Sequence, residues 1–231
     1  MLDWIFNNFS NRIRSLNQPW LTKEKLAQYA EACSYSGSLY PNIVGFIDGT
    51  CRPICRPKKQ QELYYSGYYK EHLVKYQGLM LPNGLLARVD GPYIGKRHDS
   101  AIIHSSKIIS EMEEIFVNAD GTWFSLYGDS GYANQKFVKV GFKNRAKLSD
   151  AQKKFNTDMS ALRVSVEYGF GKIIQLFAFL DFKKNQKLLM QDIKKQYIVG
   201  GILANCHTCL NGSQVSRYFS CNPPTLEEYL Q

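Results

Sequence analysis

The sequence has no apolar run that approaches the roughly 18 residues needed to span a membrane. It also has no internal repeat and no low-complexity tract. The N-terminal stretch MLDWIFNNFSNRIRSL places acidic and amide residues among the apolar ones, which a signal peptide does not do. With 44% hydrophobic and 21% charged residues, the 231-residue chain has the composition of a soluble globular protein, either one large domain or a domain with a helical appendage.

Acidic residues are scarce relative to basic ones. The 20 Asp and Glu against 29 Lys and Arg give a net charge of +9 and a pI near 9.2. Residues 52–59 hold four bases and no acid, and residues 136–154 hold seven bases against one acid. Either cluster alone is equally well explained as a solvated basic loop, but a basic excess of this kind favours polyanionic partners.

The six cysteines do not form a strong metal signature. The pairs Cys51/Cys55 and Cys206/Cys209 have the spacing of half zinc sites. The second pair, however, lies in the apolar run IVGGILANCHTCL, where small buried thiols are common. We therefore expect buried free thiols rather than a structural zinc site.

The hydrophobic patterns predict a mixed α/β chain. Pro82-Asn83-Gly84 separates two β-prone runs, HLVKYQGLML and LLARVDGPYI, which predicts a hairpin because Asn and Gly tolerate positive φ. The other predicted elements are a helix before Pro19, a helix at 22–33 capped by Thr22, a strand ending at Asp48, a helix at 99–115, a strand ending at Asp129, and helices from Asn156 and over 186–210.

This order predicts a ribonuclease-H-like fold, an α/β arrangement with a mixed sheet flanked by helices and a short N-terminal helical segment. The predicted divisions are an N-terminal helical segment over 1–40, a core over 41–215 and a C-terminal tail over 216–231.

Two of the predicted strands end on a carboxylate. In NIVGFIDGT the apolar run stops at Asp48, and in YGDSGY it stops at Asp129. A lone buried carboxylate costs several kcal/mol unless it is paired, hydrogen-bonded or bound to metal. If the strands are parallel neighbours, both acids emerge at one sheet edge, where their repulsion demands a proton or a cation between them. Oxygen ligands suit Mg²⁺ or Mn²⁺, and two such ions form a clamp for displacement at phosphorus.

A third carboxylate, Glu167, lies on the helix after Asp129. Each acid has a simpler explanation as well. Asp48 and Asp129 stand in Asp-Gly and Asp-Ser-Gly sequences, which are common turns. Glu167 has Arg163 at i−4, so the two could form an ordinary surface pair.

Five successive blocks carry a family resemblance: GFIDGTCRPICRP, YSGYYKEHLVKYQ, DGPYIGKRHDSAI, YGDSGY and FNTDMSALRVSVEYGFGKI. In this order they resemble the Harbinger (PIF/Harbinger) transposase-derived nucleases, a branch of the DDE superfamily endonucleases. The resemblance implies a ribonuclease-H-like catalytic core that cuts and joins DNA with divalent metal. It assigns the three acids to Asp48, Asp129 and Glu167. It also makes Asp99, in KRHDS, a possible accessory metal ligand, although capping the helix that begins there is the simpler role.

The leading hypothesis is therefore a DNA endonuclease or transposase core with two Mg²⁺ or Mn²⁺ ions. Its predicted DNA contacts are Arg52, Arg56, Lys58, Lys59, Lys70, Lys75, Lys143, Arg145 and Lys147. The alternatives are an inactive, domesticated DNA- or partner-binding protein and an RNA-directed nuclease on the same scaffold. The resemblance also suggests a separate Myb-like DNA-binding partner and a homodimer. A DNA substrate in a eukaryotic host implies residence in the nucleus.

Overall fold

The computed structural model describes residues 1–188 and 190–231, without the side chains of Asp99 and Arg145. A mixed six-stranded sheet forms its centre. The strands are β1 (Ile43–Pro53), β2 (Tyr65–Ser66), β3 (Glu71–Met80), β4 (Leu86–Ile94), β5 (Ser125–Gly128) and β6 (Val138–Val140). Strand β3 pairs antiparallel with β1, β2 and β4, whereas β1 pairs parallel with β5, and β5 with β6.

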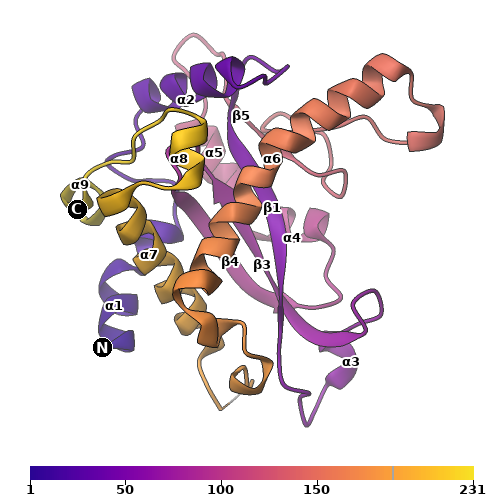
Figure 1. Cartoon of the computed structure of the whole chain (residues 1–231), viewed down its shortest axis with the longest axis vertical. Helices are drawn as coiled ribbons and strands as arrows, with labels where there is room; N and C mark the ends of the chain where they lie inside the picture. The colour runs from indigo at the N-terminus through magenta and orange to yellow at the C-terminus, as the bar shows by residue number, and fades with distance from the viewer. Residues whose placement is uncertain (189) are drawn as a thin grey trace.

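Helices surround this sheet (Figure 1). They are α1 (Leu2–Phe9), α2 (Lys23–Tyr35), α3 (Gln61–Tyr64), α4 (Asp99–Ser105), α5 (Ile108–Ile115), α6 (Asp150–Leu176), α7 (Ile193–Asn211), α8 (Gln214–Tyr218) and α9 (Leu226–Leu230). Among the described residues, short 3₁₀ turns cover Ser10–Ile13, Arg145–Lys147, Ala178–Leu180 and Lys183–Asn185. Helix α6 crosses the sheet diagonally, and its N-terminal part extends past the sheet (Figure 1). A hairpin followed by parallel strands, with flanking helices, confirms the predicted ribonuclease-H-like fold class.

Local sequence signals explain several elements directly. The predicted hairpin joins β3 to β4, and Gly84 has the φ of +83° that its turn requires. Asn83 supports this turn by accepting the backbone N–H of Leu85 through its side-chain oxygen at 3.0 Å. Thr22 caps α2 as predicted, because its hydroxyl accepts the N–H of Lys25 at 3.3 Å.

The prediction that the strand ends at Asp48 is wrong. Strand β1 continues to Pro53, because β3 pairs with it without interruption from Phe46↔Met80 to Pro53↔Leu73. What ends near Asp48 is the neighbouring strand, since the last β1–β5 pair is Ile47↔Gly128. Non-local pairing with β3 therefore overrides the turn tendency of Asp-Gly.

Three helix predictions need correction. The helix expected over 99–115 is divided into α4 and α5, and His98 rather than Asp99 stands at the N-cap of α4. Helix α6 begins six residues before Asn156, because Ser149 and Gln152 form a capping box. Helix α7 begins at Ile193, capped by Asp192, rather than at residue 186. The structure also has strand β6, where the sequence patterns predicted no element.

The N-terminal segment packs into the same core as the sheet. Leu16, Leu26 and Tyr29 are buried in the cluster that contains the strand residues. Glu111 of α5 secures the segment, because its carboxylate accepts the backbone N–H of Leu16 at 2.7 Å and pairs with buried Arg88 at 2.5 Å. The domain boundaries at residues 40 and 215 stay predictions.

Among the six cysteines, Cys33 is a fully buried free thiol. The other five are partly exposed, so the expectation of buried thiols holds for Cys33. Across residues 1–188 and 190–231, no helix combines the length and apolar character needed to cross a bilayer.

Candidate carboxylate site

The register of the two parallel strands brings Asp48 and Asp129 together. Ile47 and Gly128 are the last paired residues of β1 and β5, and each aspartate is the next residue along its chain. Opposite Asp48 on β3 lies Gly78, and a Cβ at Gly78 would lie 2.5 Å from the Phe170 ring of α6. Directly paired residues share a face of the sheet, so Asp48 faces α6.

Close packing of α6 on the sheet places the other charged side chains of the site. Gly78 leaves room for the ring of Phe170, and Gly169 of α6 leaves room for Met80 of β3. With no Cβ at either position, the helix lies close to the strands. Arg163 and Glu167, one turn apart on α6, are thereby brought to Asp48.

Each aspartate also makes a local backbone hydrogen bond. The Oδ1 atom of Asp48 accepts the N–H of Gly49 at 2.8 Å, and Oδ1 of Asp129 accepts the N–H of Gly131 at 2.9 Å. The bond at Asp129 is the Asx-type turn that the simpler explanation predicted. Turn formation engages one oxygen of each carboxylate, so it does not compete with a further role for the other oxygen.

Arg163 is the charged partner of Asp48, whose side chain is partly buried. Its Nη1 bonds to Oδ2 of Asp48, and its Nη2 lies 3.6 Å from Oε1 of Glu167. The side chains of Arg163 and Asp48 are 18% and 16% exposed, whereas that of Glu167 is 57% exposed. The predicted Arg163–Glu167 pair therefore exists, but Arg163 is bonded more closely to Asp48.

Even with Arg163 bonded to it, the surroundings of Asp48 disfavour its ionised form. Burial raises the pKa of Asp48 to about 6, although Arg163 and the Gly49 N–H act in the opposite direction. The nearby carboxylates of Asp129 and Glu167 raise this pKa further. The three predicted acids are thus close enough to interact, and added positive charge would stabilise the site.

The donor chemistry suits a hard divalent ion, because three carboxylates supply only oxygen ligands. Within the described parts of the chain, however, no three His, Cys, Asp or Glu side chains form a ready-made metal centre. The raised pKa of Asp48 and the proximity of the three carboxylates favour binding of a cation. In this structure, the guanidinium of Arg163 contacts Asp48 and lies near Glu167. Asp99 cannot be placed in this site, because its side chain lies outside what the structure describes.

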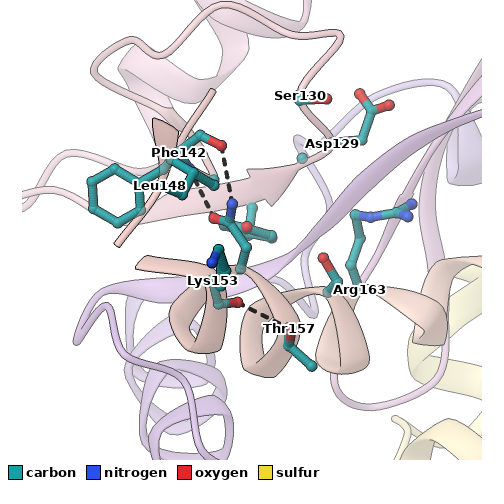
Figure 2. Close-up of a pocket in the computed structure, with 12 residues that line it drawn as sticks. Asp129, Ser130, Phe142, Leu148, Lys153, Thr157 and Arg163 are labelled. Carbon is teal, nitrogen blue, oxygen red and sulfur yellow. Dashed lines mark hydrogen bonds between the residues drawn. The ribbon is translucent and has the colours of Figure 1, made fainter. Parts of the chain in front are cut away.

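A pocket of about 630 Å³ adjoins Asp129, between the chain after β5 and the N-terminal half of α6. Asp129 and Arg163 lie at one end, and Phe142 and Leu148 at the other (Figure 2). Asn156 of α6 fixes the backbone of Phe142 in the pocket wall. Its side-chain oxygen accepts the N–H of Phe142 at 2.8 Å, and its side-chain nitrogen donates to the carbonyl of Phe142 at 3.0 Å. The pocket therefore combines a charged end with an aromatic end.

The predicted DNA-contact residues fall into three groups. The residues exposed to solvent are Arg56, Lys58, Lys59, Lys70, Lys143 and Lys147. Arg52 is largely buried, with an 11% exposed side chain that bonds Asp181 at 3.0 Å and Thr50 at 2.7 Å. Lys75 is partly buried in β3, and the side chain of Arg145 lies outside the described part of the chain.

Sequence reasoning missed the pairing of Arg163 with Asp48. A signal was present, since a base one turn before Glu167 lies on the same helix face as that acid. Which strand residue this face meets depends on how α6 packs, and that is a tertiary property.

Fold and site together define a ribonuclease-H-like α/β domain with carboxylates gathered where β5 ends beside β1. A protein-family comparison agrees with this class: the model for DDE superfamily endonucleases matches residues 47–205, more than half of the chain. The chain therefore belongs to the DDE superfamily endonuclease family. Searches of curated proteins and of solved structures found no significant match.

Proposed function

We propose that this chain is the catalytic core of a divalent-metal-dependent DNA endonuclease or transposase of the Harbinger type. Membership of the DDE endonuclease family supports a nuclease. The observation that carries the proposal is the placement of Asp48, Asp129 and Glu167 near one another from three separate elements.

In this proposal the three carboxylates hold Mg²⁺ or Mn²⁺, most simply two ions. Bound divalent ions supply activation of the attacking oxygen and stabilisation of the leaving oxygen. The chain's own contribution is to fix the acids: β1 and β5 set Asp48 and Asp129 in register, and the packing of α6 sets Glu167. The hydrogen bonds that Asp48 and Asp129 accept from the N–H groups of Gly49 and Gly131 restrict the two side chains further.

DNA is the proposed substrate, and the basic surface supports this. Lys143 and Lys147 are exposed on the segment that leads into the pocket wall, and Lys153 lines the pocket itself (Figure 2). Lysines at these positions can contact phosphates on either side of the scissile bond. A Myb-like partner, a homodimer and nuclear residence remain parts of the proposal that await experiment.

The test is nicking of supercoiled plasmid in Mg²⁺ or Mn²⁺ by wild type and by Asp129→Asn. Asparagine keeps an oxygen for the Gly131 N–H, so the variant should fold. We expect cleavage to fall by about a hundredfold or more, because a ligand charge is lost. Asp158→Asn is the matched control, since Asp158 pairs with Lys154 on α6 and contributes no carboxylate to the site.

Undiminished nicking by Asp129→Asn, under conditions in which a mock preparation made without the protein does not nick, would contradict the proposed site. DNA binding without nicking by the wild type in either metal would instead support the inactive, domesticated alternative. An RNA–DNA hybrid cut in preference to duplex DNA would point to the RNA-directed reading.

A further inference from the structure

Arg163 has a position that an ordinary surface pair does not explain. Its guanidinium reaches from α6 to Oδ2 of Asp48 on β1 while staying within 3.6 Å of Glu167, so it bridges two of the three proposed ligands. The side chain is 18% exposed, and the carboxylate of Asp48 is equally sheltered at 16%. The positive charge of the site is therefore supplied by the protein itself.

This contact places a positive charge on the carboxylate that a metal ion would use. Oδ1 of Asp48 already accepts the N–H of Gly49, and Oδ2 accepts the guanidinium of Arg163. A guanidinium and a divalent cation at the same carboxylate oxygen repel each other, and shielding from solvent makes this repulsion stronger. A divalent cation that binds Oδ2 of Asp48 is therefore expected to displace Arg163 from it.

The neighbouring pocket provides space for such a movement. Arg163 lines the 630 Å³ pocket together with Asp129, and Figure 2 shows it on the wall at the Asp129 end. A small rotation of the long arginine side chain toward this open space would release Oδ2 of Asp48 without moving α6.

We propose that Arg163 is the built-in counter-cation of the metal-free site and that it sets the affinity of the site for divalent cations by competing with them for Asp48. This inference rests on the proposed function, because it takes Asp48 and Glu167 as metal ligands. It makes Arg163 a positioning residue that acts through the acids.

The test is Mn²⁺ binding, measured by calorimetry without DNA, for wild type, Arg163→Gln and Arg163→Lys. Glutamine removes the competing charge, so Arg163→Gln should bind Mn²⁺ about tenfold more tightly or better. Lysine keeps a charge but cannot bridge both carboxylates with a planar fork, so its affinity should fall between the two. Lys154→Gln is the matched control: it removes a charge paired with Asp158 at i+4 on the same helix and should bind as wild type does.

A second measurement keeps the test valid if Arg163→Gln folds poorly. In the wild type, the side-chain NMR signal of Arg163 should shift on addition of diamagnetic Mg²⁺, because its partner changes. The corresponding signal of Arg88, which pairs with Asp90 and Glu111 away from the site, should not move.

The outcomes separate this inference from the proposed function. Wild type that binds Mn²⁺ and nicks DNA, with Arg163→Gln binding no more tightly, would overturn the inference alone. Binding by Arg163→Gln where wild type shows none would support it in its strongest form. Absence of binding in all variants would overturn both the inference and the metal-dependent function.

Discussion

Replacing Asp48 by asparagine tests the physical character of the site without any metal. Asparagine has nearly the same shape and keeps an oxygen for the N–H of Gly49, so the change removes chiefly the charge. Burial outweighs the ion pair with Arg163 and raises the pKa of Asp48 from 3.8 to about 6. Ionisation of this carboxylate is therefore less favourable in the folded chain than in the unfolded one.

The sign and size of the effect follow from this shift. Between the two pKa values the folded state binds more protons than the unfolded state, so the contribution of Asp48 to stability is lost as pH rises through about 6. At 1.36 kcal/mol per unit, a shift of about two units corresponds to about 3 kcal/mol. Asp48→Asn lacks this loss, so its free energy of unfolding relative to wild type should rise by about 3 kcal/mol from acidic to neutral pH.

The assay is urea denaturation of both proteins in EDTA at several pH values between about 4 and 7.5, followed by circular dichroism. Taking the difference between variant and wild type cancels the titration of the other groups. Asp158→Asn, which removes a partly exposed carboxylate paired with Lys154 on α6, is the control for loss of an acidic side chain away from the site. If the Asp48→Asn difference stayed flat, or moved in favour of wild type as pH rose, the ion pair with Arg163 would outweigh burial and the reasoning would be refuted.

Two further predictions concern the packing that positions the site. Gly78→Ala should lower the free energy of unfolding by about 1–3 kcal/mol and reduce nicking, because its new methyl group would meet the Phe170 ring of α6. Urea denaturation measures the stability, and plasmid nicking measures the activity. Gly171→Ala is the control: its Cβ meets nothing within 4 Å, so its stability should be equal to that of wild type or higher. Glu111→Gln should cost about 2 kcal/mol and speed proteolysis of the N-terminal segment, because it removes the charge that pairs with buried Arg88 and weakens the bond to Leu16. Exposed Glu113 on the same helix is its control, and equal proteolysis of the two variants would contradict the role of Glu111.

The sequence by itself determined the features that depend on near neighbours in the chain. The hairpin at Pro82-Asn83-Gly84 and the cap at Thr22 were predictable, because turn and cap chemistry acts over a few residues. The fold class followed from the order of the apolar patterns. The candidate acids could be named because a carboxylate that interrupts or ends an apolar run needs a partner.

Tertiary structure decided which groups meet. Strand β1 passes through Asp48 because β3 pairs with it there, and the ending of β5 at Gly128 is what brings Asp129 alongside. The pairing of Arg163 with Asp48 depends on how closely α6 packs over Gly78, across more than a hundred residues of chain. Such contacts depend on long-range packing, which a pattern read along one chain does not contain, so the partner of Asp48 emerged only from the folded molecule.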